Sequence, residues 1–176
     1  MQTSTADLWE TIAGEAEQES RLWHEALRPD PERELVFSPL GEERYGLGLE
    51  TIYEGYLVHY GNSRLFAPPD ADTALLLGDY LYAHGLVRIA QVGNVEGVAD
   101  LAELISLCAQ LRADTAPGDG AAWAASAALL GRGALDAARR ALRDEGDANP
   151  LAALAAEHAG PLPLEHALAA HARRLR

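Results

Sequence analysis

The chain has 176 residues, of which 48% are hydrophobic and 6% aromatic, and its 27 acidic side chains outnumber 14 basic ones to give a formal charge of −13. This composition predicts a single acidic globular domain over residues 1–176. All 14 basic residues are arginine. Chemistry that requires a lysine, such as a Schiff base or the phosphate contact of a P-loop, is therefore excluded.

The charge and the hydropathy pattern bear on partners and location. An acidic chain repels the phosphates of nucleic acids and of anionic lipids, so DNA and RNA are poor candidate partners. No run of about 18 apolar residues occurs, and the N-terminus is acidic where a secretory signal would be basic. We therefore expect a cytoplasmic protein without a transmembrane segment.

Alanine and leucine dominate the sequence and runs of β-branched residues are nearly absent, which predicts an all-α fold. Glycine, proline and capping residues separate the helices. A long first helix and an irregular connector precede two apolar helices, and the alanine-rich end divides into shorter helices. The expected helices cover residues 6–27, 47–60, 72–90, 95–111, 121–131, 134–145, 150–159 and 164–175.

Acidic and histidine side chains provide the first candidate site. Glu50 and Glu54 lie four residues apart on one helix face, with His59 a turn and a half further along, and such a set could bind a metal or transfer protons. A structural role is the commoner use of carboxylates at this spacing. Cys108 recurs with apolar neighbours at three- and four-residue steps, which predicts a core residue rather than a nucleophile. We expect no metal and no cofactor.

Two segments carry a family resemblance. In GLETIYEGYLVHYGNSR, residues 48–64, Glu50, Ile52 and His59 keep the register E-x-I-x-x-x-x-L-x-H, and ALLLGDYLYAHGLVRIA, residues 74–90, contains an apolar-Gly-Asp pattern. Together they resemble the trans-isoprenyl (polyprenyl) diphosphate synthases. The resemblance implies a truncated, isoprenoid-synthase-like helical bundle. Its parts would be a family-like core at 47–112, an N-terminal helix and connector at 1–46, and short alanine-rich helices at 113–176.

The family's magnesium-binding aspartates are missing from this chain. Their three positions fall on Tyr60, Gly61 and Arg64, a degenerate metal motif without a carboxylate. In the family, magnesium held by carboxylates takes up the negative charge that develops on the diphosphate leaving group. The lysines of the family's substrate motifs are absent as well. The resemblance therefore implies a pseudoenzyme that has no activity by itself.

The resemblance also implies a subunit interface. In the family the helices equivalent to 72–90 and 95–111 form much of it, and here they are the most apolar of the chain. The leading hypothesis is an accessory or regulatory subunit in isoprenoid biosynthesis that pairs with a catalytic polyprenyl diphosphate synthase. A homodimer would use the same apolar face. Alternatively, each of these residues packs in the protein's own core and contacts no partner. The predicted interface residues are Leu75, Leu76, Leu81, Leu86, Ile89, Val98, Leu101 and Ile105.

Other functions stay open. The degenerate fold would serve as a homodimeric scaffold, as a subunit of an unrelated complex, or as a protein whose cavity binds an isoprenoid or another apolar ligand. The expected lining of that cavity is Tyr53, Tyr56, His59, Tyr60, Arg64 and Asp79. A divergent enzyme would instead bind a metal through Glu50, Glu54, His59 and Asp79.

Overall fold

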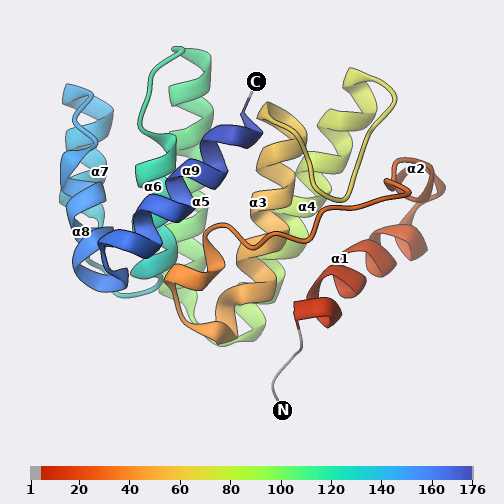
Figure 1. Ribbon diagram of the computed structural model, residues 1–176, viewed down its shortest axis with the longest axis horizontal. Helices are drawn as coiled ribbons and strands as arrows, with labels where there is room; N and C mark the ends of the chain where they lie inside the picture. Colours follow the sequence, from red (N-terminus) through yellow and green to blue (C-terminus); the bar gives the residue numbers. More distant parts are fainter. Residues whose placement is uncertain (1–4, 176) are drawn as a thin grey trace.

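The computed structural model describes residues 5–175 of the chain, and within that range it contains helices and no strand (Figure 1). The all-α prediction is thereby confirmed. Two 3₁₀ turns, Ser38–Leu40 and Glu43–Tyr45, interrupt the connector, and a π-helical turn, Ala141–Glu145, extends α7. The α-helices are α1 (Thr5–Glu19), α2 (Arg21–Glu25), α3 (Gly46–Tyr60), α4 (Ala71–Gln91), α5 (Val95–Ala113), α6 (Asp119–Ala128), α7 (Asp136–Arg140), α8 (Asn149–Ala159) and α9 (Pro161–Arg174).

The first helix differs from the prediction. A single helix was expected over residues 6–27, but Ser20 adopts an extended conformation, with φ −151° and ψ 136°, and its side chain accepts a hydrogen bond from the amide of Leu22. A serine in this geometry is an N-cap, so it starts a new helix. The predicted helix therefore divides into α1 and α2.

α3 forms the centre of the molecule, because 11 of its 15 residues are buried. It packs closely against α4 through glycines spaced seven residues apart on each helix. A Cβ atom added to Gly55 would lie 2.9 Å from the carbonyl oxygen of Gly78, and one added to Gly85 would lie 3.0 Å from that of Gly48. The absence of side chains at these positions is what lets the two backbones approach.

Two apolar cores flank α3. The larger one joins α3 to α5, α6, α8 and α9, and α9 crosses in front of α6 on its way to the end of α3 (Figure 1). The smaller one is built by α1, whose Trp9, Ile12 and Ala16 pack with Val58 and Leu81 of α3 and α4. None of the described helices is both long and apolar enough to span a membrane.

Candidate functional site

Arg64, the last position of the degenerate metal motif, lies fully buried between two carboxylates. Its Nη1 donates to Oε2 of Glu50 over 2.6 Å, and its Nε donates to Oε2 of Glu54 over 2.8 Å. All three side chains are at most 1% exposed. The pKa of Arg64 is raised, because the attraction of the two carboxylates outweighs the opposing effect of burial. The guanidinium is thus an internal cation held by the two glutamates that the sequence singled out.

The remaining carboxylate oxygens in this cluster are also occupied. Oε1 of Glu54 accepts from the Ser63 hydroxyl and from the backbone amides of Arg64 and Leu65, and Oε1 of Glu50 accepts from the hydroxyl and amide of Ser38. Carboxylate oxygens that already accept from protein donors are not free to ligate a metal. Glu50 and Glu54 therefore have a structural role here.

Aromatic rings enclose the guanidinium of Arg64 as well. The Cζ atom lies 4.5 Å from the ring centroid of Trp9 in α1 and 5.0 Å from that of Tyr53 in α3. Such cation–π contacts strengthen when water is excluded. Arg64, which falls on a magnesium-ligand position of the family that the chain resembles, therefore links α1, α3 and the loop after α3 through its contacts.

Two of the tyrosines predicted to line an apolar-ligand cavity pack inside the protein's own core. Tyr53 and Tyr56 are at most 1% exposed. Their rings pack against Trp123 of α6, with centroids 5.0 and 5.5 Å away, and Tyr53 also packs edge-on against Phe37 at 5.1 Å. His171 of α9 closes the cluster.

A polar network behind these rings joins α3, α5, α6 and α9. Asp119 Oδ2 accepts from the Tyr56 hydroxyl and from Arg112 Nη2 at 2.5 Å, and it lies 3.5 Å from Nε2 of His171. The other ring nitrogen of His171 is 2.9 Å from the Tyr53 hydroxyl. Burial alone would raise the pKa of Asp119, but the neighbouring imidazole of His171, the hydrogen bond from Tyr56 and the charge of Arg112 lower it well below its usual range.

The titratable groups of this network bond to one another. Burial raises the pKa of the Tyr53 and Tyr56 hydroxyls above their usual range, so both stay protonated and serve as hydrogen-bonding groups. Cys108, which the sequence places in the core, is buried, and burial also raises its pKa. A buried, protonated thiol is a poor nucleophile. These groups hold the four helices together.

The metal set of the divergent-enzyme hypothesis does not converge. Nε2 of His59 lies 3.3 Å from Oδ1 of Asp79, and the ring of His59 packs over Gly78, whereas Glu50 and Glu54 contact Arg64. Burial lowers the pKa of His59. Among the described residues no group of three or more histidine, cysteine or acidic side chains is placed to hold a metal ion.

The predicted interface residues fall into three groups. Leu81, Ile89 and Leu101 are at most 1% exposed and pack inside the protein's own core, so they offer no surface to a partner, and the prediction was wrong for them. Leu86, Val98 and Ile105 are half-buried against that core. Leu75 and Leu76 are 55% and 56% exposed on the outer face of α4.

The exposed apolar surface is concentrated near α4. Five of the seven large apolar residues that the described chain exposes lie between positions 75 and 95. They are Leu75, Leu76, Val87, Val92 and Val95. Leu75, Leu76 and Val87 are the three of these residues that belong to α4, and they define what is called the α4 outer face below.

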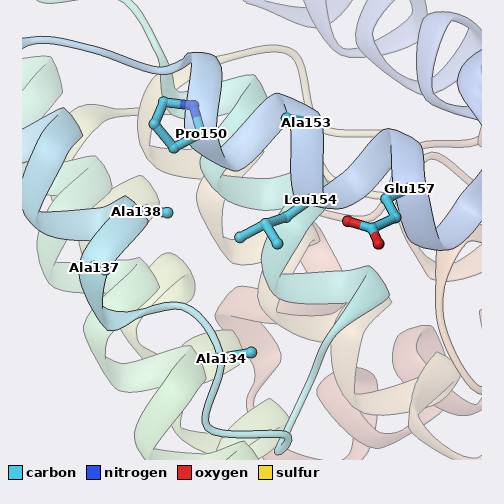
Figure 2. Close-up of a pocket in the computed structure, with 7 residues that line it drawn as sticks. All are labelled: Ala134, Ala137, Ala138, Pro150, Ala153, Leu154 and Glu157. Carbon is cyan, nitrogen blue, oxygen red and sulfur yellow. The ribbon is translucent and has the colours of Figure 1, made fainter.

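A groove between α7 and α8 is the second surface feature, and sequence reasoning did not identify it. Its volume is about 450 Å³, and small apolar residues from both helices form most of its lining (Figure 2). The lining residues are Ala134, Ala137, Ala138, Pro150, Ala153, Leu154 and Glu157. The alanine-rich composition predicted short helices there, but not the gap that their small side chains leave.

No protein-family description, curated protein or solved structure matches this chain.

Proposed function

We propose that this protein is a non-catalytic accessory subunit that works by binding another protein through the α4 outer face. The observation that carries the proposal is the exposure of Leu75, Leu76 and Val87, each at least 54% accessible on a single helix. Fully burying such a side chain contributes about 1.5–3 kcal/mol, and each of these, already about half covered, would contribute roughly half of that. A partner that covers the face recovers this free energy.

The hydrogen bonds of the Arg64 cluster support the part of the proposal that the protein is not a catalyst. Phosphoryl-type leaving groups need hard cations held by free carboxylate oxygens. Glu50 and Glu54 instead surround Arg64 and accept from Ser38 and Ser63. A guanidinium in this buried position contacts neither solvent nor a substrate, so the cluster contributes stability rather than chemistry.

The sequence resemblance supplies the identity of the proposed partner, a catalytic polyprenyl diphosphate synthase. The charge of the chain favours such a heteromer over a homodimer. Two copies that each carry a formal charge of −13 repel each other. A catalytic subunit with a less acidic surface would not be opposed in this way, so the α4 outer face would be covered by a different chain.

Co-expression with the catalytic polyprenyl diphosphate synthase of the same organism tests the proposal. Light scattering gives the mass of the purified complex, and an isopentenyl-transfer assay gives its activity. The double variant Leu75→Glu/Leu76→Glu should lose the complex while remaining folded, because both positions are exposed. Leu162→Glu is the matched control, since Leu162 is exposed at 76% on α9, away from α4.

Each outcome of this experiment is informative. A complex that survives in the Leu162→Glu control and is lost in the α4 double variant supports the proposal. A wild-type protein that dimerises alone through α4, and does not bind the synthase, contradicts the heteromer and identifies a homodimeric scaffold. Isopentenyl transfer by the protein alone contradicts the absence of catalysis.

A further inference from the structure

We propose that the groove between α7 and α8 docks a short, basic, amphipathic helix from a partner protein. The groove has a volume of about 450 Å³ and lies open along the surface of the two helices (Figure 2). It is built from different elements than the α4 outer face. In Figure 1, α7 and α8 lie at one end of the longest axis, and α4 lies on the other side of the centre, with α2 beyond it. This proposal is therefore independent of the proposed role of α4.

The shape of the groove follows from the small side chains that line it. Ala137 and Ala138 of α7 and Ala153 of α8 present only methyl groups, while Leu154 forms a larger apolar wall (Figure 2). A depression with a methyl floor accepts bulky apolar side chains from outside, as the holes of one helix accept the knobs of another. An amphipathic helix supplies such side chains at i, i+3, i+4 and i+7.

Glu157 indicates that the occupant of the groove is basic. This glutamate belongs to the groove lining, is exposed, and makes no ion pair or hydrogen bond with another described residue. On α7 and its π-helical extension, Arg139 and Arg143 are paired with Asp100 and Glu103, and the exposed Arg140 does not line the groove. A lysine or arginine beside the apolar stripe of the incoming helix would complement this edge.

The same charges disfavour other occupants. A second copy of this chain carries a formal charge of −13 and would place more acidic side chains beside Glu157. A neutral apolar ligand would fill the methyl floor but leave the carboxylate without a counter-ion. A second copy gives a distinguishable result in the test, as dimerisation that Ala153→Leu abolishes.

The test uses a short synthetic helical peptide with leucines at i, i+3, i+4 and i+7 and arginines on both flanks, labelled for fluorescence anisotropy. A peptide with the same leucines and glutamate flanks is the matched probe. The full chain is compared with Ala153→Leu, which fills the groove, and with Glu157→Arg, which reverses its charge. Controls are Ala109→Leu and Glu165→Arg, at exposed positions of α5 and α9.

We expect the basic peptide to bind wild type and both controls equally, and to bind Ala153→Leu and Glu157→Arg at least tenfold more weakly. Equal binding to all five proteins would show a non-specific charge effect and overturn the proposal. Tighter binding of the glutamate peptide, or no peptide binding combined with dimerisation that Ala153→Leu abolishes, would also overturn it. None of these readouts involves α4 or the synthase, so failure here and failure of the proposed function are separable.

Discussion

Arg64 donates from Nη1 to Oε2 of Glu50 over 2.6 Å, and the two side chains are 0% and 1% exposed. The residues lie 14 positions apart, on the loop after α3 and on α3 itself. Because Glu54 takes the other side of the guanidinium, removing the arginine would leave two buried carboxylates without a cation. The cluster is therefore more sensitive to losing one member than its net contribution to stability would suggest.

The first prediction concerns Arg64→Met. We expect a loss of about 3–5 kcal/mol in the free energy of unfolding, because the substitution leaves buried charges uncompensated. Urea denaturation followed by circular dichroism measures it. Arg21→Ala is the control, since Arg21 pairs with Glu25 on the surface, where an ion pair contributes little to stability. If Arg64→Met is as mild as this control, the cluster does not hold α1, α3 and the loop together.

The second prediction concerns the close contact between α3 and α4. Gly55→Ala should destabilise the protein by about 1–3 kcal/mol through overpacking, because the new Cβ would lie 2.9 Å from the backbone oxygen of Gly78. Gly14→Ala should stabilise it by about 0.5–1 kcal/mol, since Gly14 lies in α1 with nothing within 4 Å of the added atom. Thermal unfolding midpoints compare the two variants. Shifts of the same sign would contradict the glycine-mediated contact.

The third prediction is a pH dependence that originates at Asp119. Its folded-state pKa lies well below the ordinary value of 3.8, so the unfolded chain takes up this proton more readily. The stabilisation is complete above about pH 5 and is lost as the pH falls through the unfolded value toward the folded one. Asp119→Asn should be less stable than wild type near neutral pH, and the gap should narrow below about pH 4. Urea midpoints across this range measure the gap, and a constant gap would contradict the assignment.

The fourth prediction concerns Cys108. Burial raises the pKa of the thiol, so the native protein should react with a thiol-specific disulfide reagent only through unfolding. In denaturant one thiol per chain should react at once, because Cys108 is the single cysteine. Fast reaction of the native protein would show that the region around α5 opens readily.

The sequence predicted the fold class because alanine and leucine favour helices throughout, and it placed Cys108 correctly because its helix has one apolar face. It could not predict that α1 and α2 divide, since a serine within an otherwise helical stretch signals a cap only through its backbone conformation. The sequence also did not reveal which side chain binds Glu50 and Glu54. The positions of all three residues were in view, but only the turn of the chain after Gly61 brings Arg64 back between the two glutamates.

The polar network was harder still to foresee. His171 and Tyr53 are 118 residues apart, and nothing local in α9 signals that this histidine is buried while His166 is exposed. Asp119 lies in a Gly-Asp-Gly sequence that indicates a loop break, and its role as the shared acceptor depends on how α6 packs on α3. Contacts between distant elements decide both cases, and periodicity within one element carries no information about them.

The most direct test of the central claim, association through the α4 outer face, is an equilibrium titration of the labelled protein with the catalytic polyprenyl diphosphate synthase. We expect saturable binding. The affinity should weaken at least tenfold, a loss of about 1.4 kcal/mol of binding free energy, in Leu75→Glu/Leu76→Glu and should be unchanged in Leu162→Glu. Equal affinities for wild type and the α4 double variant, or no binding by wild type, would contradict it.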